Sequence, residues 1–231
     1  MRQLTAALAV ASICILAAGC GNLGHHAHKS SPTKTPTTTT APPVAQEALD
    51  GVLLGPDQIN PAMGANAMTL TKTHAEMSDD SATMAPKECL AIDGTAQTQV
   101  YANSGYTAER DQTLTDGDNF LHYVEQAVVL FPTAKQATAF FNASAQQWPA
   151  CHQYTHTQTN TQWAAGPVSN KNGVLSTVAT QLNANTGKPW ACGRALALKN
   201  NVIIDVNTCS ANPADSAVNI ANQIAGKIPG K

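Results

Sequence analysis

The sequence predicts an α+β fold, with one globular domain built on an antiparallel β-sheet. Three observations support this class. Consecutive strand-like segments are joined by short turns, which favours antiparallel pairing. Two later segments carry apolar residues at helical spacing. The predicted folded part also contains four cysteines, an even number that suggests two disulfides in an exported chain.

Length and charge exclude some classes of function. The chain has 231 residues, a formal net charge of −2 and only 12% charged residues. This length corresponds to one ordinary domain or two small ones. No basic run stands out in the predicted folded part, so binding to nucleic acid through phosphate contacts is not expected.

The first 19 residues have the pattern of a signal peptide. Arg2 is followed by an apolar run from Leu4 to Ala18, which is too short to span a bilayer comfortably. The run ends in Leu-Ala-Ala-Gly-Cys20 and resembles a bacterial lipobox. We therefore expect lipid on Cys20 and a location on the extracytoplasmic side of the cell membrane. An ordinary secreted protein that is cleaved nearby is the alternative.

Residues 20–50 are expected to form a lipidated cysteine and a disordered linker. Six threonines and four prolines lie between Ser30 and Pro43, a composition that cannot bury a core. His25, His26 and His28 could bind a transition metal, but solvated histidines are the simpler interpretation.

The predicted folded domain comprises residues 51–231 and begins with a helix. Pro56 is placed at the start of this helix and Gly64 at its end. An irregular stretch is expected over residues 66–86. Strand patterns follow near Thr95–Tyr101, Tyr106–Gln112 and Tyr123–Phe131.

A helix is predicted after Phe131-Pro132-Thr133, and its apolar stripe ends at Trp148. Thr-rich strand candidates come next, and strands at Trp190–Leu198 and Val202–Cys209 follow. Asn212 and Pro213 indicate the start of a last helix, whose apolar face is listed as Ala217, Ile220, Ala221 and Ile224.

The last two strands predict a disulfide by their register. If Asn200 and Asn201 form a two-residue turn, Cys192 lies opposite Cys209 in a non-hydrogen-bonded pair. The Cα atoms of such pairs are about 4.5–5.5 Å apart, within disulfide reach. Pairing Cys192 with Cys209 leaves Cys89 to pair with Cys151. A metal site made of four cysteines is the alternative, and the absence of CxxC spacing disfavours it.

The same register divides this hairpin into two faces. Ala195, Val202 and Ile204 are expected on the core face. Arg194 and Asp205 share the other face, where a surface ion pair is the simple interpretation and a ligand contact is the alternative.

No catalytic motif is recognised, so neither an enzyme nor a cofactor is expected. A nucleophile elbow and an H-E-x-x-H motif are both absent from the sequence. Asp111 and Glu125 could act together as acid and base if the fold brings them close. His152 and His156 would share a strand face, where exposed residues are more usual than metal ligands, and no metal site is predicted.

Several separated blocks resemble a known family. They are the segments Tyr101–Gln112, Val124–Pro132, Trp190–Leu196 and Asn200–Val206. Together they are similar to the PknH-like extracellular sensor domain of mycobacteria, and the similarity includes all four cysteines. The resemblance implies a twisted antiparallel sheet flanked by helices, the same disulfide pattern and a broad cleft that binds an unidentified ligand. That domain is found outside the membrane on a receptor kinase and on lipoproteins.

Polar residues inside strand patterns are the candidate binding residues. We expect Arg110, Gln112 and Glu125 to line the cleft and to bind a small or wall-derived ligand without catalysis. An internal Arg110–Glu125 ion pair that staples two strands is the alternative. A second functional hypothesis is a module that binds another envelope protein through its sheet face.

Overall fold

The structure is a computed structural model that describes residues 41–230, except 75, 120 and 185–188. The expected signal peptide, the lipidation site at Cys20 and the three histidines that follow it lie outside the described residues. Within the described residues, we find no helix with the length and apolar character needed to cross a membrane.

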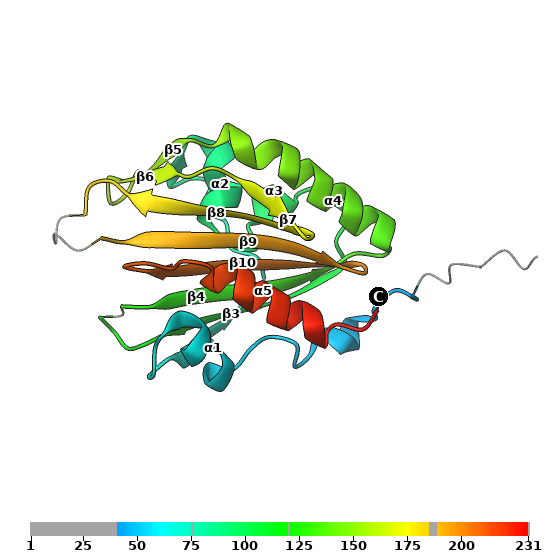
Figure 1. The fold of residues 1–231 in the computed structure, drawn as a ribbon. Helices are drawn as coiled ribbons and strands as arrows, with labels where there is room; N and C mark the ends of the chain where they lie inside the picture. Colours follow the sequence, from blue (N-terminus) through cyan, green and yellow to red (C-terminus); the bar gives the residue numbers. More distant parts are fainter. Residues whose placement is uncertain (1–40, 75, 120, 185–188, 231) are drawn as a thin grey trace, which may run out of the picture. The chain divides into compact units, whose positions relative to one another are not determined.

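A ten-stranded sheet forms the centre of the domain, and all of its strand ladders are antiparallel (Figure 1). The strand order is β1-β3-β4-β10-β9-β8-β6-β5-β2, with β7 paired to β8. The strands are β1 (Thr69–His74), β2 (Met84–Ala85), β3 (Ala108–Thr115), β4 (Tyr123–Leu130), β5 (Gln153–His156), β6 (Thr161–Ala165), β7 (Ser169–Lys171), β8 (Val174–Gln181), β9 (Ala191–Lys199) and β10 (Val202–Ser210). The α+β class is confirmed.

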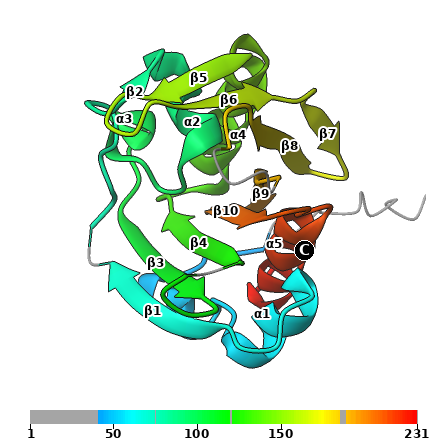
Figure 2. The same ribbon diagram turned by 90° about the vertical axis from the view of Figure 1, so that its left-hand side faces the viewer.

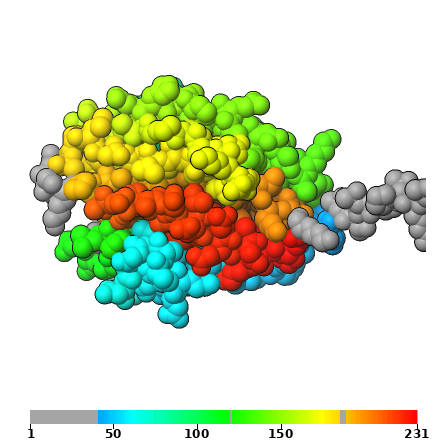
Figure 3. All heavy atoms as spheres, in the orientation of Figure 1, coloured from blue at the N-terminus to red at the C-terminus, as the bar shows by residue number. Residues whose placement is uncertain are grey.

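Helices cover both faces of the sheet, as Figures 1 and 2 show. One face carries η1 (Gln46–Leu49), α1 (Pro56–Met63) and α5 (Ser216–Lys227). The opposite face carries η2 (Lys87–Cys89), α2 (Leu90–Asp93), α3 (Thr98–Tyr101), α4 (Ala134–Gln147) and η3 (Trp148–Ala150). In Figure 3 the spheres of α5 (red) lie between those of the α1 segment (cyan) and those around β7 (yellow).

Local sequence explains where α4 begins and what the two long helices bury. Thr133 caps α4, and its side chain accepts a hydrogen bond from the Gln136 backbone NH. The stripe of α4 buries Ala137 and Phe141 against the sheet. In α5 the four expected apolar residues are buried, but the helix begins at Ser216 rather than at Pro213.

The hairpin of β9 and β10 has the expected register. Lys199 pairs with Val202 and Cys192 with Cys209, while Asn200 at the turn has a positive φ of 54°. The Cys192–Cys209 disulfide joins Cα atoms 4.1 Å apart. Cys89 and Cys151 form the second disulfide, with their Cα atoms 5.0 Å apart. Both expected disulfides are therefore present.

Three expectations about local structure were wrong. The Thr95–Tyr101 segment forms the short helix α3 rather than a strand, and residues 66–86 contain β1 and β2 rather than only irregular chain. The packed domain also begins before residue 51, because Val44 and Leu49 are buried. Val44 is held there by a hydrogen bond from its backbone NH to Asn201 Oδ1.

The expectation that only one face of the last hairpin is buried was also wrong. Leu196 and Ile203 on the second face are 2% and 0% exposed. The short helices α2 and α3 and the longer α4 cover this face. A protein partner therefore has no open face of β9 and β10 to bind, and the binding of an envelope protein through another part of the sheet stays a prediction.

Candidate functional site

A row of polar side chains crosses the sheet on the face covered by α2, α3 and α4. Strand register explains the row, because residues that are paired across strands point to the same face. His74 pairs with Asp111, Thr113 with Glu125, Glu125 with Asn207, and Asn207 with Arg194. Asp205 lies two residues before Asn207 on β10 and points to the same side. We call this set the polar row, and it contains His74, Asp111, Thr113, Glu125, Asp205, Asn207 and Arg194.

One end of the polar row is a buried ion pair. Arg194 Nη1 lies 2.7 Å from Asp205 Oδ1, and the two side chains are only 1% and 3% exposed. The other oxygen of Asp205 accepts hydrogen bonds from the Tyr101 hydroxyl at 3.0 Å and from the Ala96 backbone NH at 3.1 Å. The expectation of a surface ion pair was wrong, because it followed from treating this sheet face as solvent-exposed.

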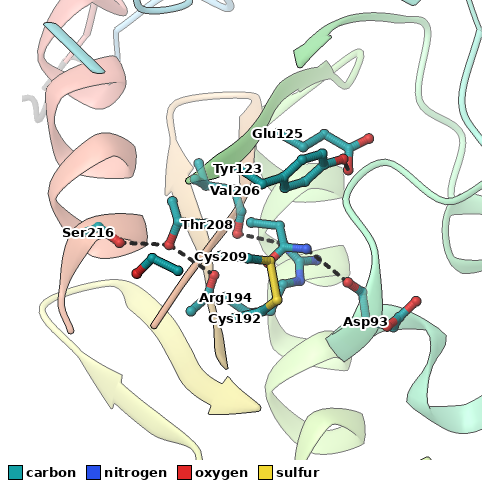
Figure 4. The surroundings of a disulfide bond; sticks show 12 residues. Asp93, Tyr123, Glu125, Cys192, Arg194, Val206, Thr208, Cys209 and Ser216 are labelled. Atoms are coloured by element: carbon teal, nitrogen blue, oxygen red, sulfur yellow. Dashed lines mark hydrogen bonds between the residues drawn. A yellow bond between two sulfur atoms is a disulfide. The ribbon is translucent and has the colours of Figure 1, made fainter. Parts of the chain in front are cut away.

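Arg194 also connects the sheet to the segment that contains α2. Its Nη2 donates to the carbonyl oxygens of Ala91 and Gly94, each at 2.9 Å. Its Cζ lies 5.5 Å from the ring centroid of Trp148, a distance typical of a cation–π contact. Figure 4 shows Arg194 beside the Cys192–Cys209 disulfide. This end of the row is therefore a structural connection between layers.

The other end of the row is a cluster of His74, Asp111 and Glu125, which come from β1, β3 and β4. Ligand-type atoms of these three residues all lie within 4.8 Å of one another. Asp111 is 1% exposed, and neither of its carboxylate oxygens has a hydrogen-bond partner among the described residues. We call this set the acidic cluster.

Two neighbouring hydroxyl groups orient the other members of the acidic cluster. The Tyr123 hydroxyl donates to Glu125 Oε2 at 3.0 Å. The Thr113 hydroxyl lies 3.3 Å from His74 Nε2. Figure 4 shows that Tyr123 and Glu125 lie on the β4 side of the Arg194 region. The cluster therefore borders the ion pair on the same sheet face.

Burial changes the acidity of both carboxyl groups. Burial, reinforced by the nearby charge of Glu125, raises the pKa of Asp111 to about 9. Burial also raises the pKa of Glu125 to about 7, although the Tyr123 hydrogen bond opposes this shift. The fold therefore brings the two carboxyl groups together, as an acid–base pair would require. Because burial disfavours two adjacent negative charges, a proton or another cation is favoured between them.

Arg110 and Gln112 lie on the opposite face of the sheet from Glu125. Gln112 Nε2 donates to the carbonyl oxygen of Leu54, and Arg110 Nε lies 2.9 Å from Asp50 Oδ1. The three residues therefore do not line one surface, and the alternative Arg110–Glu125 staple is not formed. The cause is strand alternation, since Gln112 pairs with Gln126 and Thr113 with Glu125.

Arg110 nevertheless lines a hollow at the side of β3. This hollow has a volume of about 490 Å³. We call it the β3-edge hollow, and its lining includes Glu76, Thr98, Tyr106, Glu109 and Arg110. The described pairing of β1 with β3 ends at Asp111, so residues 108–110 pair with β4 on one side and adjoin the hollow on the side of β1.

Two other histidines, His122 and His156, are paired with carboxylates. His156 Nε2 lies 2.7 Å from Asp93 Oδ1, and His122 Nδ1 lies 2.7 Å from Asp116 Oδ2. The Asp93 hydrogen bond raises the pKa of His156. His152 is exposed and lies just before β5. His152 and His156 are not brought together with a third ligand among the described residues.

Sequence reasoning missed His74, because residues 66–86 were interpreted as irregular. The segment Thr69–His74 does contain three threonines, a residue type favoured in strands. Its side chains are mostly exposed, however, so the apolar alternation that reveals a strand is missing. The acidic cluster could not be assembled without the position of this strand.

Comparison with known proteins places the chain in a family. Residues 44–227 match the sequence profile described as the PknH-like extracellular domain. The serine/threonine-protein kinase PknH of Mycobacterium bovis is 36% identical over 191 residues, which are 80% of this chain and 32% of the kinase. PknH of Mycobacterium tuberculosis is also 36% identical, over 30% of its length. The chain thus spans about a third of the length of these kinases.

The structural comparison agrees with the sequence comparison. The crystal structure of the extracellular domain of PknH from Mycobacterium tuberculosis has a TM-score of 0.75 and 34% sequence identity to this chain. The similarity covers 80% of this chain and 97% of that domain. The matched part of the kinase is thus its extracellular domain. This chain belongs to the family of PknH-like extracellular domains.

Proposed function

We propose that this chain is a lipid-anchored envelope protein whose sensor-type domain binds a small or wall-derived ligand in the β3-edge hollow, without catalysis. The observation that carries the proposal is the hollow itself, which combines volume with polar side chains of both charges. Ligand sites commonly place a few polar groups in such a concave surface. Family membership adds support, because the matching domain is the extracellular part of a serine/threonine-protein kinase in the relatives.

The residues around the hollow suggest what kind of molecule it accepts. Arg110 offers a cation that can bind a carboxylate or phosphate in a bidentate manner. Glu76, an exposed carboxylate in the lining, can accept hydrogen bonds from an amine or hydroxyl group, whereas the carboxylate oxygens of Glu109 are buried and have no hydrogen-bond partner among the described residues. Burial raises the pKa of Glu109. A polar ligand with both acidic and donor groups fits this lining.

A non-catalytic role agrees with where the acidic groups lie. Asp111, the carboxyl group with the largest pKa shift among the described acids, is almost completely buried and cannot contact a substrate in the β3-edge hollow directly. Arg110 and Glu76 supply charge for recognition, and neither is a nucleophile activated by a neighbouring base.

The binding experiment compares small molecules that co-purify with the protein from its native envelope. The parent chain, Arg110→Ala and a control Lys171→Ala are purified in parallel and analysed by mass spectrometry. Lys171 is an exposed cation on β7, outside the hollow. We expect a molecule enriched with the parent and the control but absent from Arg110→Ala. Equal enrichment with all three proteins would exclude the hollow as the binding site.

The lipid anchor is tested separately. In Cys20→Ala, the thiol that would carry the lipid is removed, so the precursor should remain unprocessed and should not be retained normally in the membrane. Cys14→Ala is the matched control, because Cys14 lies inside the expected signal peptide. Normal processing and membrane retention of Cys20→Ala would contradict the anchor.

A further inference from the structure

We propose that His74, Asp111 and Glu125 form a binding site for one divalent transition-metal ion of the Zn²⁺ type. The proposal goes beyond ligand capture in the β3-edge hollow and does not depend on it. The three side chains come from three consecutive strands of the sheet order, β1, β3 and β4. The site would therefore tie the edge strand β1 to the two strands beside it.

The first argument is geometric. The three ligand atoms lie within 4.8 Å of one another, and His74 and Asp111 are direct partners in the β1–β3 register. Tetrahedral Zn²⁺ holds nitrogen and oxygen ligands at about 2.0–2.2 Å, which places them about 3.4 Å apart. Small side-chain rotations can supply this contraction. A fourth position would be available to water.

The second argument is the unsatisfied state of Asp111. A buried polar group normally has a hydrogen-bond partner, and an exception requires an explanation. Asp111 is 1% exposed, and both of its oxygens lack a partner among the described residues. It lies within ligand distance of His74 and Glu125, so a cation between the three residues would give Asp111 the partner that the protein does not provide.

The third argument is charge balance. Asp111 and Glu125 bring two carboxylates together, while the nearby Arg194 is already bound to Asp205. The positive charge of Lys72 lowers the pKa of Asp111, but Lys72 is an exposed residue on the edge strand β1. A divalent ion balances two carboxylates and leaves the imidazole neutral. A monovalent cation would leave one negative charge uncompensated in a buried place.

The ligand types select among divalent ions. Imidazole suits Zn²⁺, Cu²⁺, Fe²⁺ and Ni²⁺, whereas Ca²⁺ and Mg²⁺ favour sites made only of oxygen ligands. Three protein ligands of the nitrogen and carboxylate type also match the ligand number of open zinc sites. The hydroxyl groups of Thr113 and Tyr123 supply the outer hydrogen bonds that orient ligands in such sites.

The test is zinc titration of the full chain in a background that removes competing histidines. His25, His26 and His28 are replaced by alanine, because these residues could bind zinc on their own. In this background we expect calorimetry to give one equivalent of bound Zn²⁺. Asp111→Asn and His74→Gln should each weaken binding by more than the roughly 10–100-fold loss typical of an altered outer partner. His152→Gln is the matched control and should bind zinc as the background does.

A spectroscopic measurement identifies the ligands independently. All four cysteines of the described domain are in disulfides, so Co²⁺ in this site should show ligand-field bands without thiolate charge-transfer absorption. Tyr123→Phe should reduce affinity about 10–100-fold while preserving one equivalent. The proposal is overturned if the background chain binds no Zn²⁺, or if Asp111→Asn and His74→Gln bind it as tightly as the His152→Gln control.

Discussion

The two ends of the polar row differ in whether their buried charged groups have partners. Around Arg194, each charged group has a partner: Asp205 receives the guanidinium, the Tyr101 hydroxyl and a backbone NH. Around Asp111, two carboxyl groups and an imidazole lie together without a compensating protein cation among the described residues in contact with them. The first arrangement stabilises the packing of the α2 segment on the sheet. In the second, the carboxylate oxygens of Asp111 have no hydrogen-bond partner among the described residues and could bind a cation.

Covalent cross-links follow the same division. Cys192 precedes Arg194 by two residues on β9, and its disulfide partner Cys209 is on the neighbouring strand. Cys89 immediately precedes α2, the helix whose Ala91 carbonyl accepts a hydrogen bond from Arg194. Neither disulfide includes a residue of β1 or β3. The paired end of the row is therefore also the cross-linked end.

The largest expected effect is the loss of the Arg194 guanidinium. Arg194→Met would leave Asp205 as an unpaired buried charge and should reduce the free energy of unfolding by about 3–5 kcal/mol. Arg110→Ala is the control, because that ion pair is 36% and 66% exposed and such pairs contribute about 0–1 kcal/mol. Urea unfolding measures both. Similar losses for the two variants would show that the Arg194 pair is not an important structural connection.

Removing either disulfide should have the next largest effect. Cys89 and Cys151 are 62 residues apart in sequence, and Cys192 and Cys209 are 17 apart. In the chain-entropy model, the two bonds contribute about 4 and 3 kcal/mol respectively. Double serine variants and urea unfolding test this order. A clearly larger loss from the shorter loop would mean that local packing near Arg194, rather than chain entropy, dominates.

A smaller effect on stability is expected from the pH dependence of the His156–Asp93 pair, at the margin of the Arg194 end of the polar row. The hydrogen bond to Asp93 raises the pKa of His156 in the folded protein above its usual value of 6.5. This stabilisation is fully present below pH 6.5 and is lost as pH rises through the higher pKa of the folded state. Subtracting the pH profile of His156→Gln from that of the parent isolates the contribution. A difference that grows with increasing pH would have the wrong sign for this pair.

How well the sequence predicted each region depends on what kind of pattern its residues form. The hairpin of β9 and β10 could be predicted to the residue, because a two-residue turn fixes the register and the register fixes the Cys192–Cys209 pair. The expectation that only one of its faces is buried failed because α2 and α3 are too short to give a periodic signal. Without those helices, Arg194 and Asp205 looked like surface residues.

Sequence reasoning identified only two of the three residues of the acidic cluster. Asp111 and Glu125 could be recognised as a possible pair, but their separation depends on the β3–β4 register. Gln112, which was predicted to bind ligand, instead donates to the backbone of Leu54 together with Gln126, and the two amides hold the N-terminal segment on the opposite face. Amide and carboxyl groups in neighbouring positions therefore had different roles, and only side-chain alternation within the assembled sheet separates them.

The smallest expected effect provides the most direct contrast with Arg194. Asp111→Asn removes a carboxyl group whose oxygens have no hydrogen-bond partner among the described residues, so no such contact is lost. We expect the free energy of unfolding in a chelator-containing buffer to change by about 1 kcal/mol or less, in either direction. Asp205→Asn alters a carboxylate at 2% exposure that is paired with Arg194 through Oδ1 and accepts two hydrogen bonds at Oδ2, so it is the matched control and should be clearly destabilising. If Asp111→Asn is as destabilising as Asp205→Asn, Asp111 has a structural role and the two ends of the row do not differ. If only Asp205→Asn destabilises the protein, the fold does not need the Asp111 carboxylate, and a proton or a metal ion bound beside Glu125 accounts for its burial; the zinc titration distinguishes the two.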